Sequence, residues 1–369
     1  MKRLTKTVFA ILLSALMLAS ATGCSLIGSL LQDDPVVVVD TTEVPVNTVP
    51  PAPTDPVYTA PPAPTDPPTP TPSPVPTDPP TQTPPPTPTP TPELPKSFLF
   101  GGVEVWAGQT AVSVTGKKND IIRITPDEMD MLIKLCPNLT SLELDYCCMP
   151  DYSRIGELTN LKHLMIATTT HEQDYGIPLV DIDWIASLRN LKTLYLPYNK
   201  IDDIRALSGL SNLEELSLAW NDISDSDLEY LTDLPLSMLY LYNNSSLRDV
   251  STLSEISSLR LLHIGGNRKL KFSGIKRLTG LPHLRELDIS YCPVEDFVWV
   301  QDFKRLETLR IENSDYIDFY TYYDLASCDT LRTVVISKND KDTEKALKAM
   351  VQDTGADIEI VYWEEYKNK

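Results

Sequence analysis

The chain has 369 residues, a formal net charge of −19 at pH 7 and six cysteines. The acidic excess opposes contact with phosphate backbones, and no basic stripe accompanies it, which argues against nucleic acid as a partner. Six cysteines without a CxxC pair indicate neither a zinc site nor a disulfide framework in a chain of this length.

The N-terminus is positively charged and continues into an apolar run over residues 8–18. The run is too short to cross a bilayer, and small residues follow it, so the pattern predicts a secretory signal peptide over residues 1–23. Residues 21–24, Ala-Thr-Gly-Cys, resemble the lipobox of bacterial lipoproteins. The resemblance implies cleavage before Cys24 and lipidation of its sulfur, which makes residues 24–34 a lipid-anchored N-terminus. Ordinary signal cleavage beside an incidental cysteine is the alternative.

Residues 35–96 are rich in proline and threonine, and Pro-Thr-Asp-Pro recurs at 53–56, 64–67 and 76–79. Such a segment has too few apolar residues to form a packed core. We expect a disordered stalk with extended polyproline II character, rising about 3.1 Å per residue. A stalk of this kind holds a domain clear of a membrane.

A cap is predicted over residues 97–138. Short strands are expected at 103–106, 111–114 and 121–124. Thr125 then starts a helix, because a proline follows it and a glutamate stands three residues later.

Nine copies of a phrase close to Leu-x-x-Leu-x-Leu-x-x-Asn fill residues 139–342, spaced 22 to 30 residues apart. Within each copy, the alternation of leucine with other residues predicts a short half-buried strand. The phrase and its period resemble the leucine-rich repeat, and Asn-x-Ile-x-Asp-Ile at 199–204 resembles its internalin type. The resemblance implies an α/β solenoid with a parallel sheet on the concave face and short helical or 3₁₀ turns on the convex face. The copies open at Leu139, Leu161, Leu191, Leu213, Leu236, Leu259, Leu284, Leu306 and Leu331.

The last position of the phrase should turn the chain inward and bond the backbone of neighbouring coils. Asparagine stands there in five copies, at Asn199, Asn221, Asn244, Asn267 and Asn339. Cys147 and Cys292 fit the cysteine alternative of the family pattern. Thr169 and Ser314 depart from it, so an irregular ladder is expected there. A second cap is predicted over residues 343–369, with a helix at 343–352 and a strand at 358–363.

Residues between the leucines point outward and form columns along the sheet. Aromatic side chains gather in adjacent columns of neighbouring repeats, and such clusters are typical binding surfaces. Tyrosine also has a high strand propensity and packs along its neighbours, which is the simpler explanation. The predicted ligand-binding residues are Tyr195, Tyr198, Trp220, Met238, Tyr240, Tyr242, His263 and Tyr291.

Three further segments have two interpretations each. The pair Gly265-Gly266 either lets a group approach the backbone or makes a tight turn. Residues 171–178 form an insertion, either a binding loop or a tolerated bulge. Acidic residues at 222–227 suggest calcium, but the segment lacks the glycine and distal glutamate of an EF-hand, so a solvated loop is favoured.

No hydrolase, metalloprotease or nucleotide-binding fingerprint occurs in the sequence, and the four histidines assemble no nucleophile or oxyanion hole. We therefore expect a protein that is not an enzyme and needs no cofactor or metal. The hypothesis is an extracytoplasmic bacterial lipoprotein, held in the cell membrane through Cys24, that binds a protein partner on its concave aromatic face at the cell surface. A glycan or cell-wall polysaccharide as ligand, or a structural envelope role, remain the alternatives.

Overall fold

The computed structural model describes residues 94–117, 120–167, 178–312 and 317–366. Several features predicted above therefore lie outside the described residues: the signal peptide, Cys24, nearly all of the stalk, insertion residues 171–177, Thr169 and Ser314.

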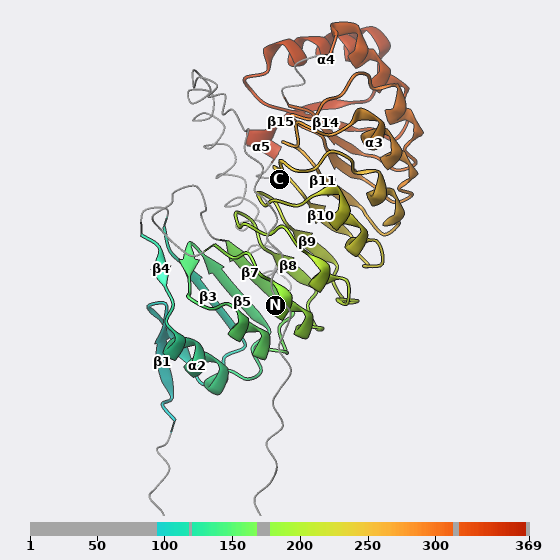
Figure 1. Ribbon diagram of the computed structural model, residues 1–369. Coiled ribbons are helices and arrows are strands. Elements are labelled where there is room, and N and C mark those ends of the chain that lie inside the picture. The colour runs from blue at the N-terminus through green and yellow to red at the C-terminus, as the bar shows by residue number, and fades with distance from the viewer. Residues whose placement is uncertain (1–93, 118–119, 168–177, 313–316, 367–369) are drawn as a thin grey trace, which may run out of the picture. The chain divides into compact units, whose positions relative to one another are not determined.

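One parallel sheet of eleven described strands runs through the repeats, and its strand order follows the chain (Figure 1). The predicted fold class is confirmed. The sheet has one strand more at each end than the nine repeats supply, because both caps add a strand. Its strands are β3 (Ala111–Thr115), β5 (Ser141–Asp145), β7 (His163–Ala167), β8 (Thr193–Tyr195), β9 (Glu215–Ser217), β10 (Met238–Tyr240), β11 (Leu261–His263), β12 (Glu286–Asp288), β13 (Thr308–Arg310), β14 (Thr333–Ile336) and β15 (Glu359–Tyr362).

Short helical turns return the chain from each strand to the next, on the side of the coil opposite the strands (Figure 1). Apolar residues spaced by three along these segments suit 3₁₀ geometry, in which side chains three apart share one face. The turns are η1 (Ser153–Glu157), η2 (Asp183–Ser187), η3 (Arg205–Leu207), η4 (Asp225–Leu231), η5 (Ser251–Glu255), α3 (Phe272–Arg277), η6 (Leu278–Gly280), η7 (Val298–Asp302) and η8 (Phe319–Ser327).

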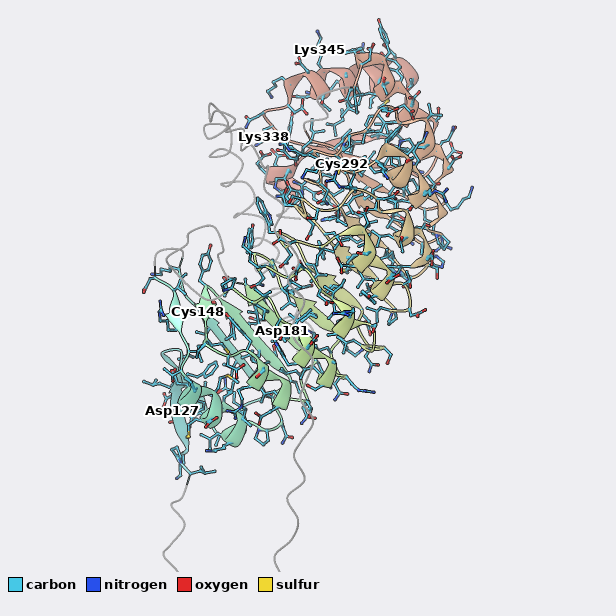
Figure 2. The ribbon with its side chains drawn as sticks, viewed as in Figure 1. Asp127, Cys148, Asp181, Cys292, Lys338 and Lys345 are labelled. Atoms are coloured by element: carbon cyan, nitrogen blue, oxygen red, sulfur yellow. The ribbon has the colours of Figure 1, made fainter. Side chains whose placement is uncertain are left out.

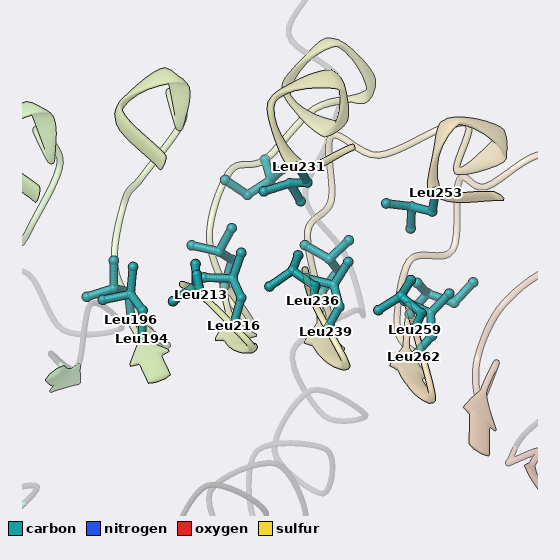
Figure 3. Packing of buried hydrophobic residues seen from close by; sticks show 14 of the residues in the cluster. Leu194, Leu196, Leu213, Leu216, Leu231, Leu236, Leu239, Leu253, Leu259 and Leu262 are labelled. Carbon is teal, nitrogen blue, oxygen red and sulfur yellow. The ribbon is translucent and has the colours of Figure 1, made fainter. Parts of the chain in front are cut away.

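The core lies between the strands and these turns. Leucines at equivalent positions, such as Leu194, Leu216 and Leu239, are fully buried and follow one another from coil to coil (Figure 3). One coil cannot cover its own leucines, so each coil completes the core of its neighbour. The leucine period therefore sets the register of the sheet.

The asparagine ladder is present in the middle repeats. The side-chain amide of Asn221 donates to Leu196 O at 2.8 Å, and its Oδ1 accepts from Ile201 N at 3.1 Å. At Cys292 a thiol takes the place of the asparagine amide and donates to Ile264 O at 3.2 Å. Asn339 differs from its prediction, since it is exposed and directly precedes Asp340, the N-cap of the C-terminal helix. The chain there enters a helix instead of another inward turn.

The N-terminal cap contains a hairpin of β1 (Ser97–Phe100) and β2 (Val103–Trp106); β2 is the strand predicted at 103–106, whereas β1 was not predicted. The helix α2 (Pro126–Leu135) begins with the predicted capping box, in which the Thr125 and Glu128 side chains each accept from the other's backbone N–H. A small parallel pair, β4 (Ile122–Arg123) and β6 (Cys147–Cys148), completes this end.

The C-terminal cap consists of α4 (Lys341–Thr354), strand β15 and a short final helix, α5 (Trp363–Tyr366). Asp127 of α2 and Lys345 of α4 lie at opposite ends of the stack of coils (Figure 2). The five cysteines among the described residues are all buried free thiols.

Candidate binding site on the parallel sheet

The strand face is the side of the parallel sheet that carries the side chains between the leucines. Its middle column follows from the observed register, which pairs Glu143 with Met165, Met165 with Tyr195, and Tyr195 with Ser217. The predicted alignment of this column is therefore confirmed. From one end to the other it contains Glu143, Met165, Tyr195, Ser217, Tyr240, His263, Asp288, Arg310, Val335 and Val361.

Three of the predicted rings form one group, the aromatic stack of Tyr198, Trp220 and Tyr242. The Tyr198 and Trp220 rings lie 5.5 Å apart at 20°. Trp220 and Tyr242 lie 6.3 Å apart at 44°. All three side chains are half-buried, and they come from three successive coils.

Two members of the stack have a left-handed backbone, with φ of 58° at both Tyr198 and Trp220. The position precedes the ladder residue, where the chain leaves the strand and turns inward. Asn243 and Gly266, at the same position of later coils, are residue types that tolerate positive φ. A bulky ring there costs of order 1 kcal/mol, a cost that other residues would avoid.

The middle column is more deeply buried than the sequence indicates. Tyr195, Tyr240 and His263 were predicted to stand open on the face, yet their exposed fractions are 8%, 6% and 4%. Alternation predicts the direction of a side chain but not its depth. In the structure, the Tyr240 and His263 rings pack edge to face at 5.1 Å, and Tyr195 clusters with Met165 and Ala167.

The polar atoms of these buried rings have partners on the same face. The Tyr195 hydroxyl donates to Glu215 Oε2 at 2.7 Å. His263 Nε2 lies 3.0 Å from Glu286 Oε1. Burial first, and then the charge of Glu215, raise the pKa of Tyr195, so the hydroxyl stays protonated. Glu215 therefore belongs to the site, although the sequence analysis did not single it out.

Tyr291 and Met238 complete the predicted set. Tyr291 is half-buried and has φ of 59°, but its ring neighbour is the Arg268 guanidinium, 5.5 Å from the centroid. It lies three coils beyond Trp220, so it is separate from the aromatic stack. Met238 is half-buried, and its sulfur accepts from the Tyr240 hydroxyl at 3.9 Å.

The two ends of the strand face differ in charge. On β5, Glu143 and Asp145 point to the same side with one residue between them. Burial first, and then the charge of the neighbouring Glu143 carboxylate, raise the pKa of Asp145 to about 6. This end is therefore a partly desolvated acidic region.

At the other end, the final helix α5 contacts the strand face. The Trp363 ring lies 3.6 Å from the Arg310 guanidinium carbon. The Tyr366 hydroxyl donates to Glu286 Oε2 at 3.1 Å, across 80 residues of sequence. The sequence does not indicate these contacts, because no periodic pattern connects the chain end to the middle of the sheet.

The guanidinium of Arg310 also lies between two carboxylates. It is 3.3 Å from Asp288 and 2.7 Å from Glu312, and all three side chains are buried. Burial is the main cause that raises the pKa of Glu312. An aromatic ring and two acids thus hold one arginine at this end of the face.

The glycine pair has a different role at each residue. Gly266 has φ of 77°, which fits the turn interpretation. A Cβ on Gly265 would meet the Tyr242 ring at 2.8 Å, so this glycine lets the ring lie against the backbone. The group that approaches the backbone is therefore part of the aromatic stack itself.

The acidic segment at 222–227 is engaged in backbone contacts. Asp227 forms a capping box with Ser224, and Asp225 Oδ1 accepts from Arg248 N at 2.6 Å. Within the described ranges, no group of three or more potential metal ligands occurs. Nor does that part of the chain include a helix long and apolar enough to cross a membrane.

Two family models, both described as leucine-rich repeat, match residues 177–223 and 280–296. Leucine-rich repeat-containing protein 56 of Mus musculus is 36% identical over 110 residues, which cover 29% of this chain and 19% of that protein. Leucine-rich repeat-containing protein 51 of Bos taurus is 33% identical over 128 residues, which cover 31% of this chain and 66% of that protein. The chain has the leucine-rich repeat fold, and the family models match two segments of its repeats.

Solved structures with a similar fold include two internalins of Listeria monocytogenes. Internalin C2 has a TM-score of 0.39 and 22% identity, covering 62% of this chain and 80% of that one. A second internalin has a TM-score of 0.35 and 19% identity, and the match covers 68% of this chain and 86% of that one.

Proposed function

We propose that this chain is a non-enzymatic lipoprotein of the bacterial cell surface. Cys24 anchors it to the cell membrane on the extracytoplasmic side, residues 35–96 form a stalk, and the repeats bind a protein partner on the strand face. Repeat proteins present extended surfaces of this kind to their partners. The observation that carries the binding proposal is the aromatic stack of Tyr198, Trp220 and Tyr242.

The position of the stack supports a binding role. Packing of the core does not require a ring at the left-handed position, because Asn243 and Gly266 occupy the same position in later coils. A ring there costs backbone energy, and strain of this kind concentrates at functional sites. Aromatic side chains offer a large contact area with little side-chain entropy to lose, as binding hot spots do.

The arrangement of the rings favours a protein over a glycan. Sugars bind aromatic residues by lying flat on an open ring face. In the stack, Tyr198 lies nearly parallel to Trp220, and Tyr242 lies within 6.3 Å of the same indole. The central Trp220 ring thus has a ring neighbour on each side and offers a sugar no open face, whereas side chains of a protein partner can approach the outer tyrosines.

The test is a cross-linking capture with the full chain and proteins of the source bacterium's envelope. Trp220→Ala removes the centre of the stack. Trp184→Ala is the matched control, since Trp184 is also half-buried but belongs to η2 on the opposite side of the coil. We expect a partner that the wild type and the control capture and that Trp220→Ala loses. Equal capture by all three chains would refute binding through the stack, and no specific capture by any would favour a structural envelope role.

The anchor has its own test. Cells that express the full chain are labelled with a fatty acid, and the mature N-terminus is identified by mass spectrometry. We expect label on the wild type and none on Cys24→Ala. An unlabelled mature chain would show ordinary signal cleavage and refute the anchor without affecting the binding proposal.

A further inference from the structure

We propose that the partner is basic and that an arginine-rich segment of it lies on the strand face between β5 and β10. The guanidinium groups of this segment would contact the aromatic stack and the carboxylates of Glu143, Asp145 and Glu215. This inference rests on the proposed function and adds the chemistry of the partner.

The first argument is the charge of this half of the face. None of β5, β7, β8, β9 and β10 contains lysine or arginine. The same strands contribute three acids, Glu143, Asp145 and Glu215, all half-buried on the strand face. His163 is the one histidine in these strands. A partner that approaches here meets three acids and no lysine or arginine within the strands themselves, so opposite charge on the partner gives complementarity.

The second argument comes from the other half of the same face, where the chain supplies the cation itself. Arg310 lies against the Trp363 ring at 3.6 Å and between the carboxylates of Asp288 and Glu312. Between β5 and β10 the acids and the rings are present, but the strands provide no guanidinium. The β12–β13 end of the same face therefore shows that an aromatic ring and carboxylates together can hold a guanidinium group.

The carboxylates on this half of the face also favour a cationic partner. Glu143 and Asp145 are on one face of one strand, and the raised pKa of Asp145 reflects burial and the charge of Glu143. A partner cation would offset both effects. Glu215 stands three strands further on, beside the Tyr195 hydroxyl, so the two acidic positions lie about 14 Å apart along the sheet.

Arginine fits better than lysine for a geometric reason. A guanidinium is planar, so it can stack on a ring and bond a carboxylate with its edge at the same time. An ammonium group is a compact and strongly hydrated charge that does this less well. The preference for arginine separates the proposal from simple attraction of any cation to an acidic protein.

The test is calorimetric titration of the full chain with three nine-residue peptides, in which glycine alternates with arginine, lysine or glutamate. Glu143→Gln with Glu215→Gln removes two charges from the face. Asp233→Asn with Glu255→Gln is the matched control, since both acids are exposed, belong to the convex side and change the net charge equally. We expect the arginine peptide to bind at least about threefold tighter than the lysine peptide, and the glutamate peptide not to bind.

The double variant on the face should lose about tenfold in affinity for the arginine peptide, and the control less than about twofold. Raising the salt concentration from about 50 to about 300 mM should weaken binding of the arginine peptide by the wild type and bring its affinity towards that of the double variant on the face. Equal losses in both double variants, or equal binding of arginine and lysine peptides, would overturn the inference.

The same variants separate this inference from the proposed function. A partner that Trp220→Ala loses but Glu143→Gln with Glu215→Gln retains would leave binding through the stack intact and refute a basic partner. A partner that Trp220→Ala retains would refute the proposed function itself.

Discussion

Asn244 is a ladder residue in the middle of the stack, and its loss should destabilise the fold. It is fully buried, its Oδ1 accepts from Ile223 N at 3.0 Å, and its amide donates to Leu218 O and Leu241 O, both at 3.0 Å. Asn244→Ala leaves the Ile223 N–H buried without a partner, whereas Leu218 O and Leu241 O each keep one donor, the amides of Asn221 and Asn267. An unsatisfied buried N–H costs about 1–3 kcal/mol, and carbonyls are tolerated somewhat better.

The expected loss is therefore about 2–3 kcal/mol in the free energy of unfolding. Asn244→Cys should lose about half as much, because the thiol at Cys292 donates to the equivalent carbonyl of the preceding coil, Ile264 O. Asn212→Ala is the control, since its exposed amide makes a single bond to Arg189 O at 3.0 Å, and its loss should stay below about 1 kcal/mol.

Urea unfolding of the full chain, followed by far-ultraviolet circular dichroism, measures these differences. With a slope of about 3 kcal/mol per molar urea, Asn244→Ala should lower the midpoint by about 1 M. A shift no larger than that of Asn212→Ala would show that the ladder only accompanies the turn and does not hold neighbouring coils together.

Three further predictions follow from single positions. Because burial raises the folded-state pKa of Asp145 from its ordinary value of 3.8 to about 6, its carboxylate destabilises the folded chain as the pH rises through this range. Asp145→Asn should thus add about 1–2 kcal/mol at pH 7, after allowance for solvent screening, and nothing at pH 3.5; a gain at both values would contradict it. Gly266→Ala should cost about 2 kcal/mol or more in urea unfolding, because φ is 77° and the new Cβ would stand 2.2 Å from Asn243 Oδ1; Gly209→Ala, with open space around it, should be close to neutral. Trp363→Ala should speed amide exchange in β15 and α5 by about 10- to 100-fold, since the ring no longer covers Arg310; unchanged exchange would show that α5 is held by other contacts.

Part of the candidate site could be predicted because strand residues alternate strictly. The period of two places Tyr195, Ser217 and Tyr240 in one column, and the observed register agrees. Alternation contains no information on depth, so the burial of Tyr195 and Tyr240 was not predictable. The positive φ of Tyr198 and Trp220 had one indirect signal, the asparagine and glycine at the same position of later coils.

The sequence by itself determined the stack of coils. Leucines at a fixed period can be buried only by identical neighbours, so composition and spacing are sufficient to specify sheet, register and ladder. Only the tertiary structure decided what covers the strand face. The contact of Trp363 with Arg310, and that of Tyr366 with Glu286, join residues far apart in the chain. Such contacts depend on where the last strand ends and how the sheet curves, and no local pattern records either.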